Sequence, residues 1–286
     1  MSRQPLVARR AEELLGHKVV STGTVAGGDI ATATRLRLTN GHSALMKTLP
    51  QAPAGFFAAE ARGLRWLADS HTVAVPRVLA VDGDCLILEW VEPATRHPAD
   101  PAVAFGADLA RLHAAGAPAF GAEEDGWIGR LPMKNTPAPT WAEFYGASRV
   151  LPYLRLAHDR GALDPADVPR VEALVSRLDT LLPEEEPARL HGDLWNGNCL
   201  WGADGRVHVV DPASYGGHRE VDIAMLHLFG FTHLARTMEA YEEVAPLAPG
   251  WEDRLGVHQL FPLLAHACMF GGGYGARVGA VAARYA

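Results

Sequence analysis

Cysteine is scarce in this chain of 286 residues, which contains only Cys85, Cys199 and Cys268. Three cysteines this far apart cannot form a disulfide framework or a CxxC metal site. Each lies among apolar residues, so we expect reduced, buried thiols. The 13 histidines show neither HxxxH nor HExxH spacing, and a zinc site built from them is therefore not expected.

Long apolar runs and excess positive charge are also missing. No window of about 18 uncharged apolar residues occurs, and the first residues, MSRQPLVARRAEELL, lack the apolar core of a signal peptide. We therefore expect a cytoplasmic protein that does not enter a membrane. The net charge of −7 argues against a nucleic-acid partner, which would favour a basic face. The sequence leaves the oligomeric state open.

The chain does have enough apolar residues, 48%, for one large domain or two coupled ones. Up to about residue 91 the pattern indicates strands around one helix, and a proline-rich stretch, 92–101, then predicts a connection to a mainly helical part. The expected strands are 35–39, 42–49 and 84–92, with a helix at 55–70. The expected later helices are 102–115, 139–160, 165–182, 220–244 and 252–284, the last with breaks.

Two stretches interrupt the helical part. Residues 116–140 are rich in proline and have little periodicity, and a loop that long is usually functional or mobile. The second stretch begins with LHGDLWNGNCLW (190–201), after an expected short strand at 187–190, and continues to a short expected strand at 206–210. Asp204-Gly205 is a hairpin signal between them. Such a hairpin brings Asp193 and Asp211, which flank it, to one rim.

Asp193, Asn198 and Asp211 form a set of oxygen-bearing side chains around that hairpin. Carboxylate and amide oxygens suit Mg²⁺, which keeps waters and accepts phosphate oxygens as further ligands. With Asn198 and Asp211 on the metal, Asp193 is left to accept a proton from an attacking hydroxyl, as phosphoryl transfer requires. Each residue alone could be an ordinary turn or cap residue. The three together favour a phosphoryl-transfer centre.

The first part of the chain supplies what a nucleotide would need. Gly27-Gly28 stands just before a strand, where backbone could approach phosphates, and Lys47 lies on the next strand among apolar residues. Glu60 follows on the expected helix, in the place of a carboxylate that pairs with such a lysine. Each of these features alone could have an ordinary structural explanation. Gly27-Gly28 could be a turn, Lys47 could lie on a solvated strand edge, and Glu60 could lie on a solvated helix face. Their order along the chain favours a kinase.

Other histidines have structural interpretations. His191, before the expected base, is interpreted as a ring that holds the loop backbone, and His113 and His266 as satisfied core histidines. A non-catalytic nucleotide-binding scaffold is the alternative outside enzymes, but such proteins generally lose the lysine, base or metal ligand. A protein kinase is disfavoured because Gly192 replaces an arginine and the segment from Asp211 to Asp222 is too short for a regulated activation loop.

With these motifs the chain resembles the protein-kinase-like superfamily and, within it, the fructosamine/ketosamine kinase family, relatives of the aminoglycoside phosphotransferases. The resemblance runs over nearly the whole length. Its marks are GGDI (27–30), FFAAEARGLRWL (56–67), LARLHAAGAPAFG (109–121), WAEFYGASRVLPYLRLA (141–157), LHGDLWNGN (190–198), DPASYGGHREVDIAM (211–225) and FGGGYG (270–275).

The resemblance implies a bilobal α+β fold, with a small β-rich nucleotide-binding lobe at 1–91 and a larger, mainly helical catalytic and substrate-binding lobe at 92–286. It implies ATP between the lobes, with adenine on the hinge backbone of Glu89, Trp90 and Val91. Lys47 would bind the α- and β-phosphates, Glu60 would orient Lys47, and Asp222 would hold the catalytic loop through its backbone. Asp193 would be the catalytic base, and Asn198 and Asp211 would bind Mg²⁺.

The implied reaction is transfer of the γ-phosphate to the 3-hydroxyl of a ketosamine, such as fructosamine or ribulosamine, free or protein-linked, in protein deglycation. Departures from the family pattern fall in 126–135, in Ala147-Ser148 and at Gly216, all on the expected acceptor side. An aminoglycoside- or choline-type phosphotransferase therefore stays open. The candidate acceptor-binding residues are Trp127, Asn135, Trp195, Tyr215, His218 and Arg219.

Overall fold

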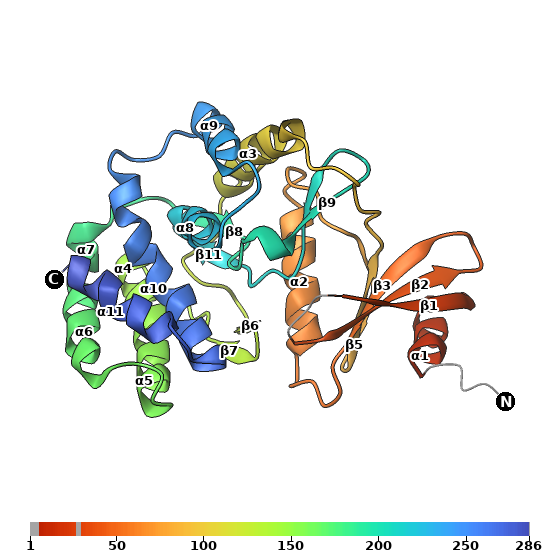
Figure 1. Ribbon diagram of the computed structural model, residues 1–286, viewed down its shortest axis with the longest axis horizontal. Helices are drawn as coiled ribbons and strands as arrows, with labels where there is room; N and C mark the ends of the chain where they lie inside the picture. The colour runs from red at the N-terminus through yellow and green to blue at the C-terminus, as the bar shows by residue number, and fades with distance from the viewer. Residues whose placement is uncertain (1–5, 27–29, 286) are drawn as a thin grey trace.

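The computed structural model describes residues 6–26 and 30–285. It consists of a lobe built on an antiparallel sheet and a larger lobe of helices, with helix α2 standing between them (Figure 1). Gly27 and Gly28, expected to approach the nucleotide phosphates, lie outside the described residues. Within those residues no helix combines the length and hydropathy that crossing a bilayer demands.

The sheet has five antiparallel strands in the order β1-β2-β3-β5-β4. Because side chains alternate along a strand, Cys85 and Ile87 face helix α1, whereas Leu86 and Leu88 pack with α2. Each face of the sheet is thus covered by one helix. The elements are α1 (Leu6–Leu15), β1 (Val19–Val25), β2 (Thr32–Leu38), β3 (Ser43–Thr48), α2 (Phe56–Ala68), β4 (Val78–Asp82) and β5 (Cys85–Glu89).

The helical lobe is held by two apolar clusters, one around helices α5, α6, α10 and α11 and the other around α3 and α9. Its helices are α3 (Ala99–Ala114), α4 (Trp141–Phe144), a π-helix η1 (Tyr145–Val150), α5 (Leu151–Asp159), α6 (Val168–Val175), α7 (Leu178–Leu181), α8 (Glu220–Phe229), α9 (Leu234–Val244), α10 (Trp251–Phe270) and α11 (Tyr274–Arg284). Short 3₁₀ turns lie at Pro165–Asp167 and Asn196–Asn198.

Three two-stranded ribbons complete the helical lobe and lie at its face toward the sheet lobe. They pair β6 (Gly126–Ile128) with β7 (Leu131–Met133), β9 (Cys199–Trp201) with β10 (Val207–Val209), and β8 (Ala188–Leu190) with β11 (Tyr215–Gly217). The ribbon β9–β10 is the hairpin that Asp204-Gly205 predicted. It places Asp193 and Asp211 on either side, as expected.

The predicted α+β fold, with a small β-rich lobe and a larger helical one, is confirmed. Three elements of the sheet lobe were not predicted: α1, β1 and β4. The long segment 116–140, expected to lack structure, contains the β6–β7 hairpin. The predicted helix at 220–244 is two helices, because Gly230 and His233 adopt positive φ (82° and 62°) and end the helical path. All three cysteines are buried and free, as predicted.

Candidate active site

A cleft of about 1160 Å³ lies between the lobes. It is larger than the roughly 300–1,000 Å³ typical of a site for one small molecule, so two ligands could occupy it together. Its walls come from β2, β3 and β5, from α2, from the segment 118–137, from the loop 193–201 and from residues 210–215. Segments far apart in the sequence therefore share one cavity.

Lys47 lies on β3, at the wall of the cleft that the sheet lobe forms, and its side chain is nearly buried. Its ammonium group is 2.6 Å from Glu60 Oε1 and 2.8 Å from Asp211 Oδ1. Burial opposes the charge, but the two carboxylates outweigh it and raise the pKa of Lys47. The predicted pairing of Lys47 with Glu60 is thus present, and the same lysine reaches across to the helical lobe.

The loop after β8 is held by its backbone. The carboxylate of Asp222, at the start of α8, accepts hydrogen bonds from the backbone N–H groups of His191 (2.8 Å) and Gly192 (2.9 Å). The buried ring of His191 accepts a bond from the Asp193 N–H through Nδ1 and reaches the Val210 carbonyl through Nε2. His191 and Asp222 therefore hold the loop, as predicted.

Gly192 shows why this loop cannot carry a larger residue. Its φ is 82°, and a Cβ built there would lie 2.1 Å from the Ala213 carbonyl oxygen. Only glycine permits this conformation and this close approach. The contact presses the loop against the segment that follows Asp211.

His113 contacts the Asp222 carboxylate as well. Its Nε2 lies 3.2 Å from Asp222 Oδ2, and its Nδ1 lies 2.8 Å from the Tyr241 hydroxyl. It is buried and fully paired, which confirms the predicted core histidine. His266 differs from its prediction: its Nδ1 bonds to the Pro262 carbonyl, but the ring lines the cleft.

Asp193, Asn198 and Asp211 come together on the helical side of the cleft, and all three line it. The side-chain amide of Asn198 donates to the backbone carbonyl of Asp193 (2.8 Å) and to its carboxylate (3.1 Å). Asp211 has a φ of 56°, a left-handed conformation that is uncommon outside glycine. Such backbone strain is typical of functional sites.

Asp193 is in an unusual protonation environment. Burial raises its pKa to about 7, the Asn198 hydrogen bond opposes this, and the charges of Asp211 and Asp222 add to it. A carboxyl group with a pKa near the working pH is suited to taking up a proton. The crowding of negative charge also marks a place where a cation would be favoured.

The expected hinge residues Glu89, Trp90 and Val91 all line the cleft at the end of β5. The Trp90 indole is fixed on one side, because it donates to Glu92 at 2.9 Å and stacks under the Arg35 guanidinium at 4.3 Å. Backbone at the hinge is therefore held beside the cavity.

Four of the six candidate acceptor-binding residues line the cleft: Trp127, Asn135, Trp195 and Tyr215. Trp127, on β6, also packs against Phe56 of α2 with ring centres 5.8 Å apart. Asn135 and Tyr215 are almost completely buried, so they contribute to the wall with little exposed surface. Sequence reasoning missed His97 and Phe270, which line the same cleft, although Phe270 begins the FGGGYG motif quoted above.

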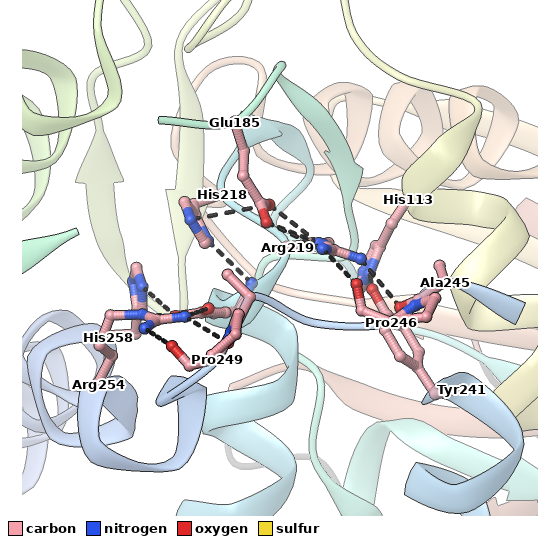
Figure 2. Close-up of polar contacts among 12 residues, drawn as sticks. His113, Glu185, His218, Arg219, Tyr241, Ala245, Pro246, Pro249, Arg254 and His258 are labelled. Carbon is pink, nitrogen blue, oxygen red and sulfur yellow. Dashed lines mark hydrogen bonds and ion pairs between the residues drawn. The ribbon is translucent and has the colours of Figure 1, made fainter. Parts of the chain in front are cut away.

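His218 and Arg219 do not reach the cleft, and the prediction that they contact the acceptor needs correction. Figure 2 shows both turned toward Glu185. Arg219 pairs with that carboxylate and donates to the carbonyls of Ala245 and Pro246. Both residues follow the end of β11, and their contacts with Glu185 keep their side chains within the helical lobe.

His218, Glu220 and His258 gather within 4.8 Å of one another, all buried, a grouping that HxxxH spacing could not reveal. Arg254 already occupies both oxygens of Glu220, at 3.0 and 2.5 Å. Burial alone would raise the pKa of Glu220, but hydrogen bonds from His258 and Arg254 lower it to about 2. The group is thus an ion-pair network that fixes the start of α8 to α10.

The site can be compared with known proteins. The model of the fructosamine kinase family matches residues 4–285. A protein of Enterococcus faecium named "Probable ketoamine kinase" is 37% identical over 89% of this chain and 91% of its own. The chloroplastic protein-ribulosamine 3-kinase of Arabidopsis thaliana is 32% identical over 96% of this chain and 85% of its own.

A crystal structure from Thermobifida fusca, provisionally described as a fructosamine-3-kinase, superposes with a TM-score of 0.92. The two sequences are 48% identical, and the match covers 98% of each chain. The bilobal architecture is therefore the one shared by protein-kinase-like phosphotransferases.

Proposed function

We propose, because this chain belongs to the fructosamine kinase family, that it is an ATP-dependent kinase that phosphorylates the 3-hydroxyl of ketosamines. Fructosamine and ribulosamine, free or linked to protein, are the acceptors we expect, and the product would serve protein deglycation. The observation that carries the proposal is the convergence of Lys47, Glu60 and Asp211 beside the Asp193–Asn198 pair in one cleft.

ATP would lie with its adenine against Glu89, Trp90 and Val91, and with its phosphates beside Lys47. Glu60 would orient that lysine, and the Gly27-Gly28 backbone would approach the phosphates. The cleft supports this arrangement because its sheet side is apolar near β5 and carries the buried ammonium group of Lys47. We place the boundary between the nucleotide-binding and catalytic lobes at residues 91 and 92.

Asn198 and Asp211 fit a magnesium ion. Asp211 has one oxygen on Lys47, which leaves its second oxygen for a cation, and the Asn198 amide nitrogen faces Asp193, which leaves its carbonyl oxygen. Hard oxygen donors with room for water and phosphate suit Mg²⁺. When bound, the ion would neutralise charge that develops on the transferred phosphoryl group.

Asp193 would act as the base. The proton of the acceptor hydroxyl passes to its carboxylate, and a bond forms between the acceptor oxygen and the γ-phosphorus. The bond from that phosphorus to the bridging oxygen breaks, and ADP leaves. The pKa of Asp193, which burial raises to about 7, supports this role, because a base works best when its pKa lies near the operating pH.

The acceptor would lie between the catalytic loop and the segment 118–137, against Trp127, Trp195 and Tyr215, with Asn135 behind them. Trp195 projects from the catalytic loop itself and packs on Phe229. An aromatic wall of this kind suits the cationic amine of a ketosamine through cation–π attraction.

The second candidate is an aminoglycoside- or choline-type phosphotransferase. Glu123 and Glu124 line the cleft on the acceptor side, and acidic side chains favour cationic acceptors. The test is ADP release from MgATP across ribulosamine, fructosamine, free ketosugars, an aminoglycoside and choline. We expect the two ketosamines to give the highest kcat/KM. ADP release with an aminoglycoside or choline alone would replace the proposal with the second candidate.

The remaining proposals concern the location of the enzyme and its partners. Use of ATP and the three buried thiols are consistent with a cytoplasmic enzyme. We propose no nucleic-acid or membrane partner.

A further inference from the structure

Arg149 is a buried cation beneath the acceptor side of the cleft. It is fully buried, and among the residues that the structure describes it forms no ion pair, although the Asp125 carboxylate interacts with its charge at longer range. Three aromatic rings surround its guanidinium instead, with Tyr215 nearest at 3.9 Å, then Phe144 at 4.6 Å and Phe261 at 5.4 Å. Such an arrangement is costly to build, because a buried charge normally needs a partner.

The backbone around Arg149 is unusual as well. It belongs to the π-helix Tyr145–Val150, which interrupts the path from α4 to α5. Helices of this type are rare and occur frequently at functional sites. Tyr145 and Arg149 both lie in this π-helix, and the side chains of both are fully buried.

The guanidinium bonds to the strand end that closes the β6–β7 hairpin. It donates to the Lys134 carbonyl at 2.5 Å and to the side-chain oxygen of Asn135 at 2.6 Å. Asn135 also contacts the other end of the hairpin, because its side-chain amide donates to the Glu124 carbonyl at 3.0 Å. Its backbone N–H also donates to Asp125 at 3.0 Å.

The hairpin fixed in this way lines the cleft. Trp127, Ile128 and Met133 form part of the cleft wall. On the side of the sheet lobe, Arg62 of α2 pairs with Glu124 at 3.0 Å and Trp127 packs on Phe56. Arg149 therefore anchors a wall that lies beside α2, the helix that carries Glu60 (Figure 1).

We propose that Arg149 is a positioning residue for the acceptor: through Asn135 and Lys134 it fixes the β6–β7 hairpin as the wall against which the acceptor binds. The Tyr215 ring beneath the guanidinium ties that wall to β11 and so to the segment that begins at Asp211. This inference rests on the proposed function, since it assigns the hairpin to the acceptor side of that reaction.

The test compares Arg149→Met and Arg149→Lys with the wild type. A reacting group displaced by about 1 Å can lose roughly 10²-fold in rate, so we expect Arg149→Met to raise the acceptor KM and lower kcat by roughly 10- to 100-fold together. The KM for ATP should stay unchanged, because the guanidinium contacts nothing on the nucleotide side. Arg149→Lys keeps the charge and some donors, and should recover part of the loss.

Two further variants separate positioning from general stability. Arg160→Met removes another guanidinium of the same lobe, which donates to the Cys268 carbonyl at 2.6 Å but lines no part of the cleft, and should leave both KM values unchanged. Asn135→Leu should raise the acceptor KM as Arg149→Met does, and the double variant should add little, because the two side chains act as one unit.

The acceptor in these assays is the compound that the wild type turns over fastest, whichever class it belongs to, so failure of the ketosamine assignment does not decide this test. An Arg149→Met or Arg149→Lys protein with an unchanged acceptor KM would overturn the inference. Equal losses in the KM values for ATP and acceptor would do the same, because they would indicate a purely structural role. If Arg149→Met does not fold, Arg149→Lys and Asn135→Leu decide the matter.

Discussion

Asp193→Asn is expected to lower kcat by roughly 10²–10⁴-fold, the usual contribution of a positioned proton acceptor. The amide keeps the shape of the side chain but cannot take up the hydroxyl proton. Lys47 and Asp211 do not contact Asp193 directly, so the nucleotide site should survive. Thermal stabilisation by MgATP, which depends only on ligand affinity for the folded state, should therefore be unchanged.

The same variant should be more stable than the wild type at neutral and alkaline pH. Burial raises the folded-state pKa of Asp193 to about 7, from the 3.8 of an aspartate in water. A raised pKa means that stability is fully present below 3.8 and is lost as pH rises through about 7. The melting-temperature gain of Asp193→Asn should thus be absent near pH 3.8, grow up to about pH 7 and then level off.

The matched control is Asp204→Asn, the same change in the exposed turn between β9 and β10. Asp204 pairs with His208 at 3.0 Å and lies away from the catalytic carboxylates, so turnover should not change. Unchanged turnover in Asp193→Asn would remove Asp193 from the role of base. A melting-temperature difference that does not vary with pH would contradict the burial of its charge.

Lys47→Met should lower kcat by roughly 10²–10³-fold, the scale seen when one preorganised electrostatic donor is removed. Lys47 is the one buried cation among the described residues that contacts carboxylates from both lobes, Glu60 and Asp211. Without it, the phosphates lose their ammonium partner and Asp211 loses a fixed neighbour. The KM for ATP should rise as well.

The fold should tolerate this change. Burial raises the pKa of Glu60 to about 7 even with Lys47 beside it, so the carboxyl can take up a proton once the lysine is gone. Glu60→Gln should have a smaller effect than Lys47→Met, because the amide can still hold the lysine. Lys18→Met, at a side chain that is 78% exposed, is the control and should have no effect on steady-state rates. Equal activity in Lys47→Met and the wild type would contradict the assigned phosphate contact.

The phosphate side of the site was predictable because its chemistry is local. Asp193, Asn198 and Asp211 stand around one hairpin whose turn signal is explicit, and the ion pair of Lys47 with Glu60 needs only a strand followed by a helix. The acceptor side was not predictable in this way. Its wall depends on the β6–β7 hairpin, whose strands are only three residues long and carry Pro132, so no alternating pattern could reveal them.

The prediction that His218 and Arg219 contact the acceptor was wrong for a related reason. They follow Tyr215, which lines the cleft, but their side chains turn into the lobe and pair with Glu185. Arg149 is the opposite case. A single arginine in an otherwise helical stretch gives no sequence signal that a π-helix will bury it under the cleft.

The central claim is that this cleft transfers a phosphoryl group to a particular hydroxyl of a ketosamine. The most direct measurement is phosphorus–proton correlation NMR of the product formed from MgATP and fructosyl-lysine. A correlation from the phosphorus to the single proton on the third sugar carbon is the predicted result. A correlation to a terminal methylene group, or no organic phosphate at all, would contradict it.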